Sequence, residues 1–191
     1  MVEDMPPGVD TVTDAELIKQ YLSGQTDAFE MLYHRYRKQV YAYLNGMLPG
    51  QMATVDDLFQ KSWLKVIDKL PSYRDEGRFI AYILRIARNQ ALDWLRSQKN
   101  VVCLADGDGM AKTELPSPDR EYENHEIGKA IAGAVVKLPA EQREVFLLRQ
   151  QDVPFKEIAA IQAVSVNTVL GRMRYAVENL RRVLLRSGVQ V

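Results

Sequence analysis

A stripe of cations, one aromatic ring and one amide is the feature of this chain best suited to binding a ligand. It lies in the segment GRFIAYILRIARNQALDWLRSQK (77–99) and, at helical spacing, consists of Arg78, Tyr82, Arg85, Asn89 and Arg96. Cations bind phosphates, an aromatic ring stacks on a base, and an amide can hydrogen-bond to a base edge. The stripe therefore indicates a polyanion with exposed bases as the ligand. The alternative is a basic helix face that is simply solvated.

The opposite side of the same segment predicts how the stripe is held. Apolar residues recur there at i, i+3, i+4 and i+7, as on the core-facing side of a helix: Ile80, Ile83, Leu84, Ala87, Ala91 and Trp94. We therefore expect a helix that packs on a core and presents the basic stripe outward. Trp94 belongs to the core side.

A second pattern, FKEIAAIQAVSVNTVLGRMRY (155–175), has the spacing of a helix-turn-helix. A short helix, 155–162, is followed by the turn Ala163-Val164-Ser165, and Ser165 can cap a longer helix. Side chains at the start of that helix would project into a major groove, namely Asn167, Thr168 and Arg172. Ala163 stands where such turns often have Gly, so it must accept a less comfortable backbone conformation. A plain helical hairpin is the alternative.

Composition limits the other classes of function. The 191 residues carry 25 basic and 25 acidic side chains, so the net charge is zero and strong nonspecific nucleic-acid binding is not expected. One cysteine and two histidines argue against a His/Cys zinc site, and the sequence contains no Gly-rich phosphate loop. The carboxylates fall on helix caps and polar faces, where solvation would explain them. We expect no catalytic residue, metal or cofactor, and hence no enzyme.

The pattern of the chain predicts an all-α protein of two small helical domains. Helix signals recur in residues 13–99: Thr13 with Glu16 has capping-box spacing, and Thr54 with Asp57 would open a third helix. The helical pattern returns in residues 124–186. Residues 100–123 between them contain glycines, prolines and clustered acids and read as a flexible linker, with tails at 1–12 and 187–191. Neither an apolar membrane-spanning run nor a signal peptide is visible, so we expect a cytoplasmic protein that does not insert in a membrane.

With both patterns in view, the chain resembles the extracytoplasmic-function (ECF) sigma factors of bacteria over nearly all of residues 14–186. VDDLFQKSWLKVI resembles the polymerase-docking helix of that family, and GRFIAYILRIARNQALDWLR resembles its promoter-melting helix. EIAAIQAVSVNTVLGRMRYAVENLRRVL resembles its carboxy-terminal helix-turn-helix. The resemblance implies a sigma region 2 domain at 13–99 and a sigma region 4 domain at 124–186.

This resemblance also implies the partners and the residues that contact them. The partners would be core RNA polymerase, promoter DNA and an anti-sigma factor. The polymerase would bind Asp57, Gln60 and Lys61, for which a solvated helix face is the alternative. The melted −10 element would be held by Tyr73, Arg74, Arg78, Tyr82, Arg85, Arg88, Asn89 and Arg96, although Tyr73 and Tyr82 could instead be core rings. The −35 duplex would be read by Ser165, Asn167, Thr168, Arg172 and Arg174.

Several positions depart from the family pattern. Tyr82 replaces the usual Trp, and Lys61 replaces a frequent Glu in the docking helix. Gln162, Leu170 and Gly171 replace the usual Leu, Lys and Ser around the recognition helix, so one phosphate contact should weaken or the target sequence should be unusual.

Two other readings remain open from the residues alone. One is a helix-turn-helix regulator that acts without polymerase, which predicts a ligand pocket or a dimer seam in residues 13–99. The other is a helical module that serves mainly to dock a partner.

Overall fold

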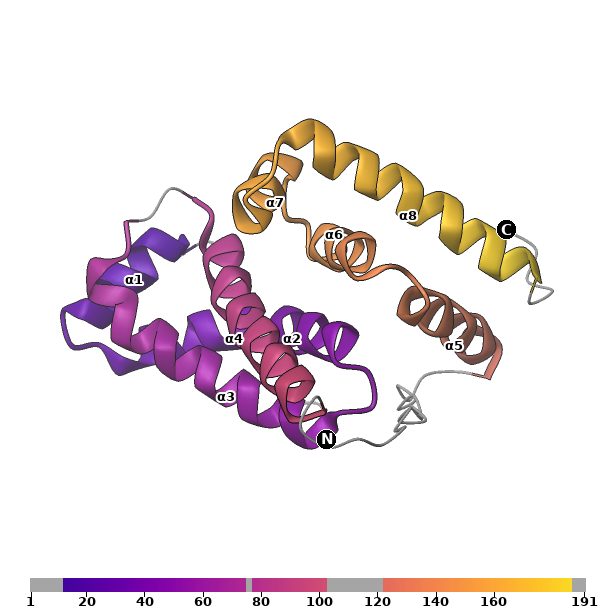
Figure 1. Ribbon diagram of the computed structural model, residues 1–191. Helices are drawn as coiled ribbons and strands as arrows, with labels where there is room; N and C mark the ends of the chain where they lie inside the picture. Colours follow the sequence, from indigo (N-terminus) through magenta and orange to yellow (C-terminus); the bar gives the residue numbers. More distant parts are fainter. Residues whose placement is uncertain (1–11, 75–76, 103–121, 187–191) are drawn as a thin grey trace.

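The structure, a computed structural model, describes residues 12–74, 77–102 and 122–186, and all regular secondary structure in these ranges is helical. Two groups of helices are visible (Figure 1). The first comprises α1 (Asp14–Leu22), α2 (Thr26–Met47), α3 (Met52–Lys69), a short 3-10 turn (Leu70–Ser72) and α4 (Phe79–Val102). The second comprises α5 (Tyr122–Val136), α6 (Ala140–Gln150), α7 (Phe155–Gln162) and α8 (Val166–Arg186).

The predicted all-α class with a four-helix unit and a helix-turn-helix unit is thus confirmed. Most of the predicted linker, residues 103–121, lies outside the described residues, as do 1–11 and 187–191. None of the described helices combines the length and apolarity that crossing a membrane requires.

The helix ends follow local chemistry, with one correction. Thr13 and Glu16 form the expected capping box: the Glu16 N–H donates to Thr13 Oγ1 at 3.3 Å, and the Thr13 N–H donates to Glu16 Oε2 at 2.8 Å. The prediction that Thr54 opens the third helix is wrong, because α3 begins at Met52. Gly50 turns the chain with φ 78°, a backbone conformation that glycine adopts readily. The chain is helical again from Met52, before Thr54.

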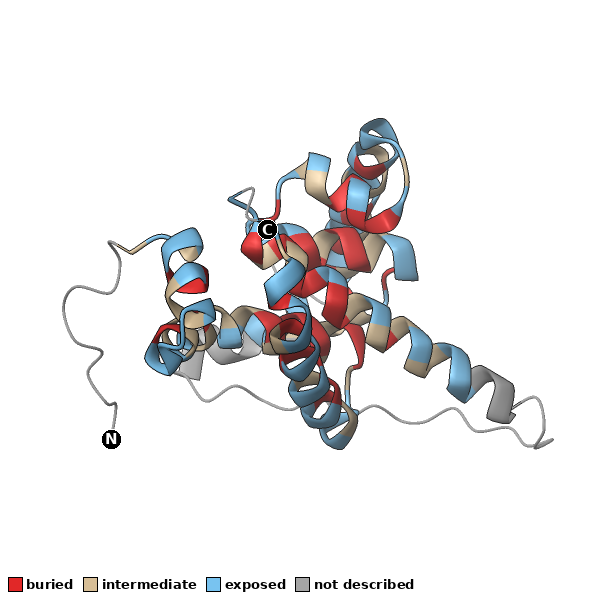
Figure 2. Cartoon of the chain, turned by 90° about the vertical axis from the view of Figure 1, so that its left-hand side faces the viewer, coloured by how far each residue is buried: buried red, intermediate tan, exposed pale blue. Residues whose placement is uncertain are grey.

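The core of the first group lies where α2, α3 and α4 face one another (Figure 2). The predicted inward side of α4 is confirmed: Ile83, Leu84, Ala87 and Ala91 are buried. Ile80 and Trp94 are half-buried and pack against this core. The basic stripe is therefore turned away from the centre of the four-helix unit.

A buried polar contact fixes α4 on α3. Ser62 is fully buried, and its Oγ donates to the Leu58 carbonyl at 2.7 Å. Gln90 Nε2 of α4 donates to the same Oγ at 2.8 Å. A hydrogen bond that satisfies buried polar groups is directional, so it specifies how α4 lies on α3 in a way that apolar packing alone does not.

The helix-turn-helix forms over the predicted residues. Ile158 and Ala159 of α7 and Val169 of α8 are buried between the two helices. Ala163 adopts the left-handed conformation, with φ 54° and ψ 45°, as the turn requires. Its neighbour Val164 donates its N–H to the Ala159 carbonyl at 3.1 Å, which closes the end of α7.

The two groups of helices pack against each other, with α2 and α4 facing α6 and α7. Leu147 of α6 sits against Gly46 of α2 so closely that a Cβ at position 46 would lie 2.5 Å from Leu147 Cδ2. Tyr43 of α2 is fully buried nearby, and this burial raises the pKa of its phenol well above the ordinary value. The sequence patterns do not predict this packing.

Candidate nucleic-acid interface

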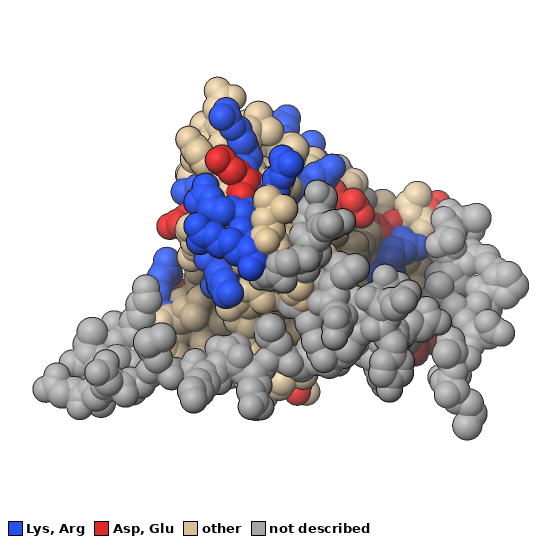
Figure 3. All heavy atoms as spheres, turned by 90° about the vertical axis from the view of Figure 1, so that its right-hand side faces the viewer, with Lys and Arg blue, Asp and Glu red and all other residues tan. Residues whose placement is uncertain are grey.

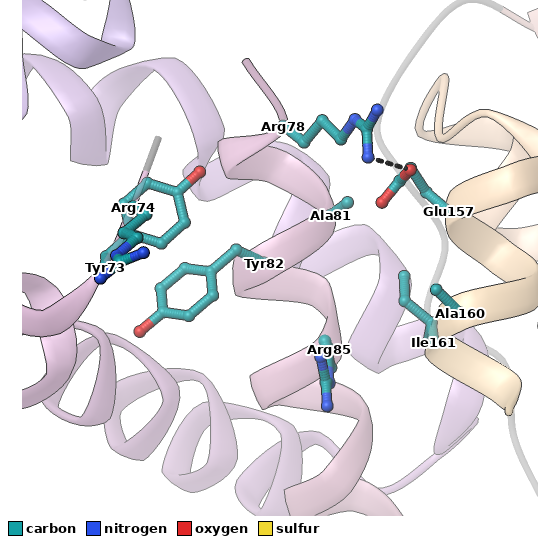
Figure 4. Close-up of a pocket in the computed structure, with 9 residues that line it drawn as sticks. All are labelled: Tyr73, Arg74, Arg78, Ala81, Tyr82, Arg85, Glu157, Ala160 and Ile161. Atoms are coloured by element: carbon teal, nitrogen blue, oxygen red, sulfur yellow. Dashed lines mark ion pairs between the residues drawn. The ribbon is translucent and has the colours of Figure 1, made fainter. Parts of the chain in front are cut away.

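A groove of about 150 Å³ lies where α4 meets α7 (Figure 4). From the first domain it is lined by Tyr73, Arg74, Arg78, Ala81, Tyr82 and Arg85. From α7 it is lined by Glu157, Ala160 and Ile161. Five side chains predicted to hold a melted strand, two rings and three cations, thus converge on one concave surface.

The two tyrosines of the groove are held by Phe79, the first residue of α4. Phe79 is buried, and its ring centroid lies 5.5 Å from that of Tyr73 and 6.1 Å from that of Tyr82. The two tyrosine centroids are 4.5 Å apart, and burial raises the pKa of Tyr82. Each ring is half-buried: it packs against the core and also lines the groove, so the binding role of the two tyrosines stays a prediction.

An ion pair crosses the groove between the domains. Arg78 Nη1 lies 2.7 Å from Glu157 Oε1, and the Glu157 side chain is only 15% exposed. Figure 4 shows Arg78 reaching from the start of α4 toward α7. Glu157 lies in the first turn of α7, where the helix dipole favours a negative charge. Arg78 precedes α4, where the dipole disfavours a cation, so the carboxylate compensates an unfavourable position.

Arg88 lies apart from the groove. Its guanidinium pairs with Glu144 of α6 through Nε to Oε1, and its Nη2 lies 3.5 Å from Glu144 Oε2. The two side chains are 17% and 7% exposed. The expectation that carboxylates occupy solvated faces is therefore wrong for Glu144, which is buried in the contact between the domains.

Asn89 and Arg96 lie on exposed positions farther along α4. Arg96 Nη1 is 3.2 Å from Asp93 Oδ1, with both side chains more than 70% exposed, so this pair contributes little stability. The stripe predicted from the sequence therefore has two parts: its first half lines the groove, and its second half faces solvent.

The start of α8 is capped as the sequence predicts. The Thr168 N–H donates to Ser165 Oγ at 3.1 Å, and the two hydroxyl oxygens are 2.8 Å apart. Asn167 and Arg174 are exposed. Arg172 is half-buried instead, and its Nη1 donates to Gln162 Oε1 of α7 at 2.8 Å.

The net positive charge of the second domain lies on its last helix. α8 contains five arginines and one glutamate. Figure 3 shows Lys and Arg side chains gathered over this side of the molecule. A cationic helix that follows a turn is the expected electrostatic arrangement for duplex DNA.

The predicted polymerase contacts form an exposed polar face of α3. Asp57, Gln60 and Lys61 are all exposed, and Lys61 Nζ pairs with Asp57 Oδ2 at 2.7 Å. Such a pair between exposed side chains is worth at most about 1 kcal/mol, so it would cost little to replace with a contact to a partner.

Sequence reasoning missed the residues that α6 and α7 bring to the interface. Glu144 and Glu157 read as ordinary polar-face acids, and Ala160 and Ile161 read as helix residues without a role. No periodic or spacing signal links them to α4, because they belong to another domain and meet it only through tertiary packing.

These features define an all-helical, two-domain protein with a cationic aromatic surface on one domain and a helix-turn-helix on the other. Residues 32–101 match the family described as Sigma-70 region 2, and residues 129–180 match Sigma-70, region 4. The chain is 29% identical over 188 residues to the ECF RNA polymerase sigma-E factor of Salmonella typhimurium strain LT2, covering 92% of this chain and 97% of that one. It is 30% identical over 168 residues to the RNA polymerase sigma factor CarQ of Myxococcus xanthus, covering 87% and 95%.

The fold is also similar to a solved structure, that of the sigma factor RpoE in complex with the anti-sigma factor NepR from Bartonella quintana. The TM-score is 0.71 at 20% identity, over 82% of this chain and 96% of that one. The chain belongs to the ECF family of RNA polymerase sigma factors. Its function is that of a sigma factor in transcription initiation, which sets aside a regulator that acts without polymerase.

Proposed function

We propose that this sigma factor reads the upstream promoter element as duplex through α8 and captures the melted −10 element as a single strand on the α4 surface. The observation that carries the proposal is the convergence of Tyr73, Tyr82 and three arginines on one groove. Flipping a base out of its stack costs a few kcal/mol. Stacking on a ring returns about 1–3 kcal/mol per base, so one or two captured bases would offset the cost without nucleotide hydrolysis.

Core RNA polymerase would dock on the exposed polar face of α3. Asp57, Gln60 and Lys61 present two charges and an amide on neighbouring turns, and their mutual ion pair is weak enough to be exchanged. Replacing Asp57 and Gln60 by alanine should weaken pull-down of the core enzyme. Alanine at Glu30 and His34, an exposed pair on α2, serves as the matched control and should leave pull-down unchanged.

Before it binds polymerase, the protein would hold its −10 surface against α7. Glu157 neutralises Arg78, and Glu144 neutralises Arg88, so two of the predicted DNA-binding cations face carboxylates. Together with the zero net charge, this supports weak promoter binding by the isolated protein. Polymerase would separate the domains and fix their spacing, which raises the effective concentration of the second contact once the first is made.

We also propose that an anti-sigma factor binds and regulates this protein. The similar RpoE structure holds an anti-sigma factor, NepR. By the same reasoning from the family, the protein would act in the cytoplasm, without membrane insertion, and as a binding factor and not an enzyme.

In vitro transcription with core polymerase on a genomic promoter library tests the proposal. Addition of the protein should give new initiation sites that share an upstream and a −10 element. Asn89→Ala should then reduce strand opening at those promoters, measured by permanganate reactivity of unpaired thymines. Absence of protein-dependent initiation would refute the promoter assignment, and full opening with Asn89→Ala would refute the single-strand role of this residue.

A further inference from the structure

Two of the four α8 side chains that are expected to read DNA, Arg172 and Thr168, already have partners within the protein. The Arg172 guanidinium donates to Gln162 Oε1 at 2.8 Å, and the Thr168 hydroxyl lies 2.8 Å from Ser165 Oγ. Both contacts have structural roles, since the first ties α8 to α7 and the second belongs to the helix cap. Arg172 is thus held against α7, and the solvent-facing side of α8 carries other residues beside the exposed Thr168.

The helix geometry identifies that face. Asn167, Leu170 and Arg174 are spaced i, i+3 and i+7, so they share one side of α8, and all three are exposed. At about 100° per residue, Arg172 is roughly 140° from Asn167 around the helix. The face thus places an apolar side chain, Leu170, which is 44% exposed, between an amide and a cation.

Gly171 lies beside Leu170 on this face and is not required by the fold. A Cβ at this position would have no atom within 4 Å, so no neighbour within the protein excludes a side chain. Glycine is otherwise unfavourable inside a helix, where alanine is preferred. The absence of a side chain beside Leu170 lets another molecule approach the backbone of α8 closely.

The major groove of DNA offers one apolar group, the 5-methyl of thymine, and apolar side chains contact it. An asparagine beside it can bind the adenine N6 and N7 atoms, and an arginine can bind guanine or a phosphate. The face of α8 therefore matches the edges of an A·T-containing site. A lysine, the residue usual in the family at position 170, would instead seek phosphate or guanine.

We propose that Leu170 reads a thymine methyl in the upstream promoter element, with Gly171 admitting the base edge and Asn167 reading a neighbouring base. The proposal rests on the proposed function, in which α8 lies in the major groove. It makes Leu170, and not Arg172, a residue that sets promoter specificity.

The experiment uses holoenzyme assembled from core polymerase and the full chain. Duplexes randomised over the upstream element are selected for binding, and each selected thymine is then replaced by deoxyuridine, which removes only the methyl group. The unaltered protein should select thymine at one position at least, and deoxyuridine there should weaken binding about fourfold, as expected for one buried methyl-sized group. Leu170→Ala should bind both duplexes equally, and Leu170→Lys should no longer select thymine.

Val177→Ala is the matched control, because Val177 is an equally exposed apolar residue of α8, at 50%, more than one turn beyond Leu170. It should keep the thymine preference. Gly171→Ser should leave thermal unfolding nearly unchanged but weaken binding to the selected duplex. All of these positions are exposed or open, so folding of the variants is not expected to fail.

Four results would overturn the proposal. If deoxyuridine at no position weakens binding of the unaltered holoenzyme, or if Leu170→Ala still distinguishes thymine from deoxyuridine, the assignment of Leu170 is wrong. The proposed function would still stand in both cases, because the holoenzyme selected a promoter sequence. Loss of core binding in the Leu170 variants, with the deoxyuridine profile unchanged, identifies Leu170 as a protein contact instead. Selection of no sequence by any holoenzyme refutes both this proposal and the proposed function.

Discussion

Arg78 of α4 and Glu157 of α7 form an ion pair of 2.7 Å that joins the two domains across the candidate DNA-binding groove. The same guanidinium is predicted to contact promoter phosphates. In this arrangement of the two domains, which we call closed, the Glu157 carboxylate occupies the place beside Arg78 that a DNA phosphate would take. We therefore expect Glu157 and a phosphate to compete for Arg78.

Glu157→Gln should strengthen binding of single-stranded DNA by the isolated protein. The substitution keeps the shape of the side chain and removes the charge that competes for Arg78. Since an ion pair with a partly exposed member is worth about 0.2–1 kcal/mol, the gain should not exceed about fivefold. Fluorescence anisotropy with a labelled oligonucleotide at low salt measures it.

Glu141→Gln provides the control for this experiment. Glu141 is an exposed acid in the first turn of α6, so its substitution makes the same change in net charge in the same domain. An equal gain from both variants would mean that only the overall charge matters and that the Arg78 contact has no special role.

Breaking the contact between Arg88 and Glu144 should destabilise the protein more than breaking any exposed pair. The two side chains are 17% and 7% exposed, so removal of one leaves a charge in a poorly solvated place. Glu144→Ala should cost about 3–5 kcal/mol in the free energy of unfolding. Urea denaturation of Arg88→Ala, Glu144→Ala and the double variant gives the coupling energy.

The double variant should lose less stability than the sum of the two single variants, by about 1–3 kcal/mol. Additive losses would show that the two side chains do not stabilise each other in solution and that the closed arrangement of the domains does not depend on their contact.

Tyr82→Ala should impair promoter opening, whereas Tyr82→Phe should not. The Tyr82 ring lines the groove and packs beside Phe79, so phenylalanine keeps both the stacking surface and the packing. Loss of one stacked base corresponds to about 1–3 kcal/mol in the stability of the open complex. Permanganate footprinting of holoenzyme on a cognate promoter measures this loss, and similar footprints for both variants would contradict a stacking role.

Substitution of alanine by glycine should have opposite effects at two nearby positions. Ala163 has φ 54°, a conformation that costs an L-residue more than glycine, so Ala163→Gly should stabilise the protein by about 0.5–1 kcal/mol. Ala160 lies inside α7, where glycine costs about 1 kcal/mol, so Ala160→Gly should destabilise it. Thermal unfolding of the two variants should differ in sign; a loss at both positions would mean that the turn conformation is not strained in solution.

The sequence predicted the features that depend on local periodicity and capping. The core side of α4 is an example, since Ile83, Leu84, Ala87 and Ala91 recur with the period of a helix and are all buried. The bounds of α7 and its turn followed from the same kind of signal. Thr54 shows the limit of such signals: a capping pattern is a local preference, and the turn at Gly50 lets the helix begin earlier.

The roles of individual arginines could not be predicted in this way. Arg88 and Arg172 read from the sequence as DNA-binding cations, but each faces a polar partner within the protein, Glu144 and Gln162 respectively. Gln162 stands where the family usually has leucine, and its Oε1 accepts an N–H of the Arg172 guanidinium. The two residues are therefore linked within this protein.

The sequence by itself determined that this chain forms two helical domains, one with a basic aromatic helix and one with a helix-turn-helix, because amphipathic spacing and capping act over a few neighbouring residues. Only the tertiary structure decided that Glu144 and Glu157 meet Arg88 and Arg78 across the domains, and that Arg172 donates to Gln162 of α7. The physical reason is that ion pairs and exposure depend on distances between residues far apart in the chain, which no local pattern encodes.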